Sequence, residues 1–248
     1  MEAYALTDIG RVRTMNQDYI YSSPEKVGSL PNLFLVADGM GGHKAGDFAS
    51  RYAVEHLVIY INREGEGSPV MQLKKGIETV NEKLYGESLV REELKGMGCT
   101  LVAGVVEDHI LYAANVGDSR LYLIHGDGIR QITRDHSYVE EMVAMGQMRR
   151  GSADYNRRKN IITRAMGIGR EVEPDFFEVD IKDNDYILLC SDGLSNMMDD
   201  EAIRRIITGE GSLKDKAALL IEEANSRGGA DNIAVVLVNP LGREEGVC

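Results

Sequence analysis

Short apolar runs recur along the chain and predict β-strands. Each run is about the length of a strand, is rich in β-branched residues and is bounded by Gly, Asp or Asn. The runs are 33–37, 99–106, 110–116, 121–124, 186–190 and 233–238. Turn residues separate the runs between positions 99 and 132. This spacing predicts an antiparallel meander of four strands.

Longer segments with helical periodicity lie between these runs. The segment 45–62 places its large apolar residues on one face, and Ser68-Pro69 is an N-cap followed by proline at the first helical position. Further helix starts are predicted at Asp199 and at Ser212, where Asp215 completes a capping box. A meander with paired helices and no regular strand–helix alternation favours the α+β class, with helices covering antiparallel sheet.

The chain is predicted to form one domain over residues 1–248. It contains no internal repeat, no low-complexity tract and no convincing linker, and 64–69 is read as a loop. The segment of about 137–160 differs in character because it combines three methionines with five basic residues. We expect this segment to be an exposed, mobile flap.

The charge and cysteine content narrow the class of protein. The chain carries 28 Lys and Arg against 40 Asp and Glu, a net charge of −12, which argues against binding to nucleic acid or to an anionic membrane. Cys99, Cys190 and Cys248 are too few and too scattered for a disulfide framework. The start lacks the pattern of a signal peptide, and no apolar run reaches the ~20 residues of a membrane helix. We therefore expect a cytoplasmic protein with reduced thiols and no membrane insertion.

The most informative pattern is the position of four aspartates at the ends of predicted strands. Asp38 and Asp192 each follow an apolar run and precede glycine, Asp118 follows the run 110–116, and Asp231 precedes the last run. An isolated carboxylate at the end of a buried strand is costly unless it is paired or bound to a metal. The following glycine permits a sharp turn and close approach of a ligand to the backbone.

Two interpretations of this pattern are open. Taken singly, an Asp-Gly pair is more often a turn than a metal ligand, and Asp118 could be a turn acid paired with Arg120. Taken together, four such acids at one sheet edge would provide carboxylate and carbonyl ligands for Mg²⁺ or Mn²⁺. Nucleotide binding has little support because the sequence contains no Walker motif and no complete G-x-G-x-x-G.

Seven blocks, in order, make the chain resemble the bacterial type-2C metal-dependent protein phosphatases of the PPM family. The resemblance covers almost the whole chain. The blocks are 7–18 (TDIGRVRTMNQD), 36–46 (VADGMGGHKAG), 97–101 (MGCTL), 114–120 (ANVGDSR), 133–137 (TRDHS), 189–194 (LCSDGL) and 229–233 (GADNI). The resemblance implies an α/β/β/α sandwich: two antiparallel sheets face to face, helices outside, and metals at one end.

The resemblance also implies the activity and a ligand set. The activity is hydrolysis of phosphoserine and phosphothreonine in proteins by attack of a water that bridges two ions. Asp38 matches the ligand that bridges two metals, and the Gly39 carbonyl matches a further ligand. Asp192 and Asp231 match the residues that complete the ligand set of the first metal. Asp118 with Asp192 matches a third, weaker position. The cofactor is thus expected to be Mn²⁺ or Mg²⁺, two or three ions per chain.

Further roles follow from the same resemblance. Arg13 matches the arginine that holds the substrate phosphate, and Asp18 matches an acid that orients water. Two positions depart from the family pattern. Gln17 stands where many relatives carry glutamate, and Met40 stands where the eukaryotic branch has a histidine proposed as general acid. His43 lies three residues beyond Met40, and its reach to the leaving group is not readable from sequence.

Two other functions compete with this one. A catalytically silent domain of the same fold would be expected to have lost Asp38, Asp192 or Asp231, and all three are present. A phosphohydrolase acting on small molecules is the second alternative, and a flap beside an open cleft favours protein substrates instead. By resemblance, the expected partners are phosphoproteins and a cognate bacterial Ser/Thr kinase that the enzyme opposes, and we expect a monomer.

Overall fold

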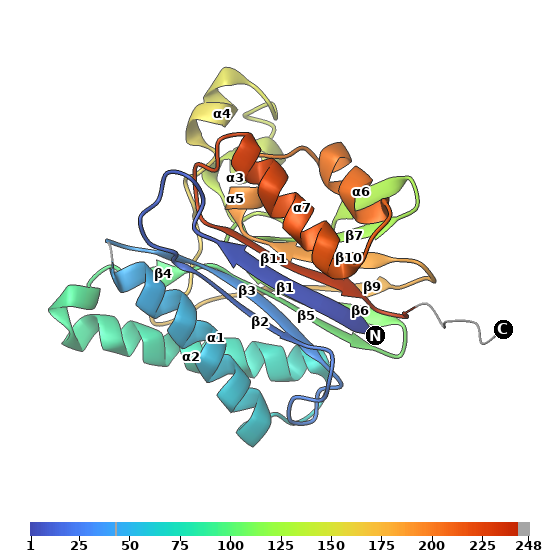
Figure 1. Ribbon diagram of the computed structural model, residues 1–248. Coiled ribbons are helices and arrows are strands. Elements are labelled where there is room, and N and C mark those ends of the chain that lie inside the picture. Colours follow the sequence, from blue (N-terminus) through green and yellow to red (C-terminus); the bar gives the residue numbers. More distant parts are fainter. Residues whose placement is uncertain (43, 243–248) are drawn as a thin grey trace.

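Two antiparallel sheets packed face to face form the centre of the molecule (Figure 1). The structure is a computed structural model that describes residues 1–42 and 44–242. The first sheet has the order β1-β11-β10-β7-β8, with bounds Glu2–Asp8, Ile233–Asn239, Tyr186–Cys190, Arg120–His125 and Gly128–Gln131. The second has the order β2-β3-β5-β6-β9, with bounds Asp18–Ser23, Leu33–Met40, Leu101–Glu107, Ile110–Val116 and Asp175–Asp180, and the short β4 (Gly98–Cys99) pairs with β3.

Helices cover the outer face of each sheet. The helices α1 and α2 pack on the second sheet, and α6 and α7 pack on the first (Figure 1). Their bounds, with those of the shorter elements, are α1 Lys44–Glu64, α2 Pro69–Val90, η1 Glu92–Leu94, α3 Tyr138–Ala144, α4 Ala153–Arg158, α5 Asp192–Ser195, α6 Asp200–Thr208 and α7 Leu213–Ser226. The predicted α/β/β/α sandwich is confirmed. Within the described ranges, no helix is both long and apolar enough to cross a membrane.

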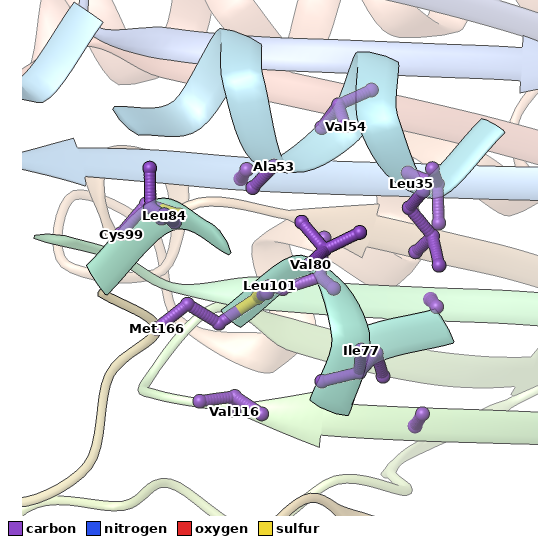
Figure 2. Packing of buried hydrophobic residues seen from close by; sticks show 14 of the residues in the cluster. Leu35, Ala53, Val54, Ile77, Val80, Leu84, Cys99, Leu101, Val116 and Met166 are labelled. Carbon is purple, nitrogen blue, oxygen red and sulfur yellow. The ribbon is translucent and has the colours of Figure 1, made fainter. Parts of the chain in front are cut away.

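The central strands bury both faces, which explains why they read as continuous apolar runs. In β3, Leu33, Leu35 and Ala37 face α1 and α2, whereas Phe34 and Val36 face the other sheet. The same alternation holds in β10 and β11. Figure 2 shows the outer layer of this core, where side chains of α1 and α2 meet those of β3 to β6. Cys99 and Cys190, which lie within apolar runs of the sequence, are both fully buried.

The predicted helix starts are confirmed by their caps. Ser68 accepts from the Met71 N–H at the start of α2, and Asp199 accepts from the Ala202 N–H at the start of α6. The capping box of Ser212 is present at the start of α7, with both reciprocal hydrogen bonds.

The predicted four-strand meander is wrong in one respect. Its first pair, β5 and β6, and its last pair, β7 and β8, are hairpins as expected, but they lie in different sheets. The chain crosses between the sheets at 117–119, where Gly117 adopts a φ of 106°. Asp118 therefore closes no hairpin, and it lies at the point where the two sheets are joined.

Three strands escaped the sequence prediction. The strands β1, β2 and β9 lie at the edges of the sheets and are mostly half-buried, and their apolar stretches are short and flanked by polar residues. The strand predicted at 99–106 is in fact interrupted at Thr100. The hydroxyl of Thr100 accepts from the Asp38 N–H at 2.9 Å, and this interruption ties β5 to the end of β3.

The segment predicted as a flap holds the two short helices α3 and α4 beside the sandwich (Figure 1). Their N-caps are Ser137 and Ser152. Glu140, whose side chain is 8% exposed, pairs with Arg150 and accepts from the Tyr155 hydroxyl at 2.8 Å. The mobility of the segment and the single-domain organisation stay predictions.

Candidate metal centre

The sequence-predicted aspartates converge at one end of the sandwich. Asp18, at the start of β2, lies directly opposite Asp38 in β3. Asp192 is the first residue of α5, immediately beyond β10, and Asp231 lies two residues before β11. Asp118 follows β6 at the crossing between the sheets. Because the strands are antiparallel, starts and ends of different strands meet at this edge, and five carboxylates gather there.

Two glycines allow this convergence. A Cβ on Gly39 would lie 2.1 Å from the Gly46 carbonyl oxygen, so the first turns of α1 can pack against the end of β3 only if residue 39 has no side chain. A Cβ on Gly193 would lie 1.9 Å from the Asn232 carbonyl oxygen. Each Asp-Gly pair therefore forms a turn and also lets two segments of the chain approach closely. The pair Asp192-Gly193 brings Asp192 against the loop of Asp231.

Asp18 and Ser191 connect the two sheets beneath the site. The Ser191 hydroxyl donates to Asp18 Oδ2 at 2.6 Å and accepts from the Ala234 N–H at 2.9 Å. Ser191 is the N-cap of α5, but its side chain makes no capping bond because it is committed to Asp18. A buried hydroxyl thus fixes one oxygen of a carboxyl that is 6% exposed.

Burial and mutual repulsion disfavour the ionised form of these carboxyls. Burial, followed by the nearby Asp192 and Asp231, raises the pKa of Asp18 to about 8, against the opposing hydrogen bond from Ser191. Burial, followed by Asp18, raises the pKa of Asp38 well above its usual value. Burial and then Asp231 raise the pKa of Asp192 as well. Positive charge added at this point would favour the ionised forms of these acids.

Asp118 lies in the same acidic environment, and Arg120 is paired with Asp135. Burial, followed by Asp192, raises the pKa of Asp118 to about 7. Arg120, which the turn interpretation paired with Asp118, instead bonds Asp135 through two nitrogens, at 2.7 Å for the closest contact. Behind Asp118, His136 Nδ1 accepts from the Gly117 N–H at 3.1 Å, so His136 supports the crossing between the sheets.

Asp231 has a different setting at the rim of the site. The Arg13 guanidinium donates to Asp231 Oδ2 at 2.7 Å, and the two side chains are 51% and 34% exposed. The loop that carries Arg13 is held by Asn232, whose amide donates to the carbonyls of Ile9 and Met15 at 2.9 and 3.0 Å. The predicted phosphate-holding residue is therefore beside the carboxylates, where it bonds one of them.

The donor set fits hard divalent cations. Oδ1 of Asp18, of Asp118 and of Asp192 is buried without a hydrogen-bond partner in the described part of the chain. Carboxylate oxygens with no donor are the ligands that Mg²⁺ and Mn²⁺ take in proteins. In residues 1–42 and 44–242, however, no three His, Cys, Asp or Glu side chains already surround one point as an ion's ligands do. The oxygen ligands that such a cation needs are therefore present, but Asp231 bonds Arg13.

Several residues of the site were not predicted to have a role. Ser191 and Asn232 are adjacent in sequence to Asp192 and Asp231, and this adjacency is the sequence signal that could have identified them. Lys159 and Asn196 had no sequence signal, because their contact joins positions 37 residues apart. The Gln17 backbone is bonded by Asn232 and Gly39. His43 lies outside the described residues.

Comparison with known proteins shows the family to which the chain belongs. The family model of protein phosphatase 2C matches residues 10–210. The chain is 41% identical to the serine/threonine phosphatase stp of Listeria innocua, over 96% of this chain and 95% of that one. It is 40% identical to the protein phosphatase PhpP of Streptococcus pneumoniae, over 96% and 97%. The crystal structure of the serine/threonine phosphatase Stp1 from Staphylococcus aureus superposes with a TM-score of 0.88 at 35% identity, covering 95% of this chain and 93% of that one.

The fold and the acidic site thus define a phosphatase built on a four-layer sandwich. The chain belongs to the protein phosphatase 2C family. It is a metal-dependent enzyme that hydrolyses phosphoserine and phosphothreonine in proteins. The predicted family and activity are confirmed.

Proposed function

We propose that the carboxylates at the joined ends of the two sheets hold the divalent cations of the phosphatase reaction. Asp38, Asp192 and Asp231, with the Gly39 carbonyl, would hold two ions, and Asp118 with Asp192 would hold a third. The supporting observation is that these side chains gather at one edge, with buried oxygens of Asp118 and Asp192 that no described donor reaches. We propose Mn²⁺ or Mg²⁺, because all the donors are oxygen atoms.

The chemistry that such cations supply when bound is Lewis-acid stabilisation of the phosphoryl oxygens and a lowered pKa of water. The protein's own task is to orient the reactants. Asp18 is suited to orienting water, because Ser191 fixes its Oδ2 and leaves Oδ1 without a partner among the described residues. We assign Asp18 the role of holding a proton of the attacking water at Oδ1.

We assign the substrate phosphate to Arg13. Its guanidinium lies at the exposed rim, on the loop 9–17 that Asn232 clamps. A planar guanidinium presents two parallel N–H donors to two phosphate oxygens. One of its nitrogens already bonds Asp231 at 2.7 Å. Phosphate bound by Arg13 would therefore lie beside the carboxylate cluster.

A covalent phosphocysteine route has little support from Cys99 and Cys190, the two cysteines within the described residues; Cys248 lies outside them. Burial raises the pKa of Cys190 to about 12 and raises that of Cys99 further still. Both thiols are fully buried. A thiol in this setting is neither ionised nor accessible, so direct attack of water on phosphorus is the simpler route.

The test compares two substrates with and without Mn²⁺. Phosphate release is measured from a phosphothreonine peptide and from an aryl phosphate after removal of metal by chelation. We expect release from both substrates only when Mn²⁺ is restored, with the higher kcat/KM on the peptide. Undiminished release without metal would refute the metal site, and a clear preference for the aryl phosphate would favour the small-molecule alternative.

The finer expectations about partners and context stay predictions. They are a cognate Ser/Thr kinase, a monomeric state and cytoplasmic action. The exact number of ions, two or three, is likewise a proposal, and metal titration of the Asp118 variant described below addresses it.

A further inference from the structure

One polar contact joins the segment 137–160 to the candidate metal ligands. Lys159, just beyond α4, donates from Nζ to Asn196 Oδ1 at 2.6 Å. Asn196, the C-cap of α5, donates from Nδ2 to Asp192 Oδ2 at 2.9 Å. The three side chains form a continuous chain from the predicted flap to a carboxylate of the proposed metal site.

The chemistry of the two end groups fixes the orientation of the Asn196 amide. An ammonium group can only donate hydrogen bonds, and an ionised carboxylate can only accept them. The amide oxygen must therefore face Lys159, and the amide nitrogen must face Asp192. An amide at position 196 is suited to both contacts, because it offers an acceptor and a donor on one planar group. A second bond, from the Asn196 N–H to the Asp192 carbonyl at 2.7 Å, holds the residue in place.

The two oxygens of Asp192 have different environments as a result. Oδ2 is held by Asn196, whereas Oδ1 is buried with no hydrogen-bond partner in the described ranges. Asp192, Lys159 and Asn196 line a cavity of about 180 Å³, together with Asp118. With Oδ2 held by the amide, rotation of the carboxylate is restricted and Oδ1 stays the oxygen available to a cation.

We propose that Asn196 is a positioning residue for Asp192 and that Lys159 connects this carboxylate to the segment 137–160. The proposal rests on the proposed metal site and adds to it a residue that touches neither substrate nor reacting atoms. Groups that hydrogen-bond to metal-ligating side chains orient them, and their loss typically weakens metal binding about 10- to 100-fold. Lys159 acts one step further away and has a smaller effect.

The test is calorimetric titration with Mn²⁺ alone. The affinity to follow is that of the site at which Asp192→Asn weakens Mn²⁺ binding. Asn196→Ala and Asn196→Leu should each weaken binding there by about 10- to 100-fold, with little change in the melting temperature of the metal-free protein. Asn196→Leu fills a similar volume, so it provides a folded variant if the alanine leaves a damaging gap. A purely structural role for Asn196 would give the opposite pattern, a lower metal-free melting temperature and unchanged Mn²⁺ affinity.

Lys159→Met tests the connection to the segment 137–160. It should weaken Mn²⁺ binding a few-fold, and it should have no further effect when combined with Asn196→Ala, because the connection is already broken. Arg157→Met is the matched control, since Arg157 is in the same segment and its ion pair with Asp154 is mostly exposed. Additive effects in the double variant, or equal effects of Lys159→Met and Arg157→Met, would overturn the role of Lys159.

The failures of the two proposals are distinguishable. If Asp192→Asn leaves Mn²⁺ binding unchanged, the proposed metal site is wrong. If Asp192→Asn weakens binding and both Asn196 variants bind as the wild type does, the metal site stands and the positioning role is wrong.

Discussion

The carboxylates of the site fall into two regions with different charge balance. In the interior, Asp18, Asp38 and Asp192 lie together, and burial followed by their neighbours' charges raises the pKa of each. At the rim, Asp231 bonds the Arg13 guanidinium at 2.7 Å, and both side chains keep exposed surface. Among the described residues, no guanidinium or ammonium group bonds an interior carboxylate directly, and Lys159 reaches Asp192 only through Asn196. The rim carboxylate has a direct cationic partner in Arg13.

Because of this difference, cation binding should have different consequences in the interior and at the rim of the cluster. Burial and mutual repulsion disfavour ionisation of the interior carboxyls, so cation binding there relieves repulsion that folding imposed. The rim carboxylate is already neutralised, so a cation that takes Asp231 as a ligand competes with Arg13. The comparison predicts that removal of an interior carboxylate raises metal-free stability and that removal of the rim carboxylate changes it little. It also predicts that removal of Arg13 tightens cation binding.

The largest effect is expected from removing a ligand charge. Asp38→Asn, Asp192→Asn and Asp231→Asn should each lower turnover of a phosphothreonine peptide at least about a thousandfold, which is ~4 kcal/mol of barrier. In the metal-free protein, Asp38→Asn and Asp192→Asn should raise the melting temperature, because each removes a repelling carboxyl. Asp231→Asn should leave it nearly unchanged, since exposed ion pairs contribute about 0–1 kcal/mol. Kinetics and thermal melts measure both.

Asp108→Asn is the matched control for these variants. Asp108 lies in the β5–β6 turn with a φ of 48°, a conformation that asparagine adopts readily. It should keep full activity and an unchanged melting temperature. Equal stabilisation by Asp231→Asn and Asp38→Asn would contradict the distinction between rim and interior.

The next effect is expected at Asp118, which borders the interior group. Asp118→Asn should leave the tightest Mn²⁺ binding intact while lowering phosphopeptide turnover about 10- to 100-fold, because a site shared only with Asp192 has few protein ligands. Calorimetric metal titration beside phosphopeptide kinetics measures the two properties. Unchanged kinetics at saturating Mn²⁺ would mean that Asp118 serves only the crossing between the sheets.

A smaller effect is expected at the rim arginine. Arg13→Ala should raise KM about tenfold, with a smaller change in kcat, because it removes a contact to the substrate phosphate and leaves the carboxylates of the site in place. It should also tighten Mn²⁺ binding, because Asp231 loses its guanidinium partner. Arg11→Ala, on the same loop, removes the same charge as a control. Weaker Mn²⁺ binding in Arg13→Ala would contradict the competition between Arg13 and the cation.

The fold was predictable where strands are buried on both faces and where helices carry their own start signals. The runs that became β3, β6, β10 and β11 are nearly continuous in apolar residues because each lies between a helix layer and the other sheet. The edge strands β1, β2 and β9 are mostly half-buried, and their apolar stretches are shorter and flanked by polar residues. The change of sheet at 117–119 was not predictable, because a turn dipeptide is the same whether the next strand pairs locally or crosses over.

The candidate site was predictable in its residues but not in its contacts. Strand-end aspartates followed by glycine pointed to Asp38 and Asp192, and the family resemblance added Arg13 and Asp18. The hydrogen bond from Ser191 to Asp18 joins positions 173 residues apart, and the bond between Arg13 and Asp231 joins positions 218 apart. Such pairings depend on which strand ends meet, which sequence spacing alone does not contain.

The smallest expected effect concerns Asp18 and the pH dependence of stability in the metal-free protein. Burial, the largest cause, raises the pKa of Asp18 to about 8 from an ordinary value of ~4. An acid with a raised native-state pKa binds its proton more tightly in the folded protein than in the unfolded one. Its contribution to stability is therefore fully present below pH ~4 and is lost as pH rises towards about 8.

Asp18→Asn removes this dependence while keeping the shape of the side chain. The melting temperature of the variant, relative to that of the wild type, should therefore increase from pH 5 to about pH 8 and then level off when chelator is present. The control Asp108→Asn should keep the melting temperature of the wild type, because Asp108 lies in an exposed turn. A constant difference for Asp18→Asn would mean that Asp18 is ionised in the folded protein at little cost. In that case the interior of the site would be no harder to charge than its rim, and the contrast between the two regions would rest on geometry alone.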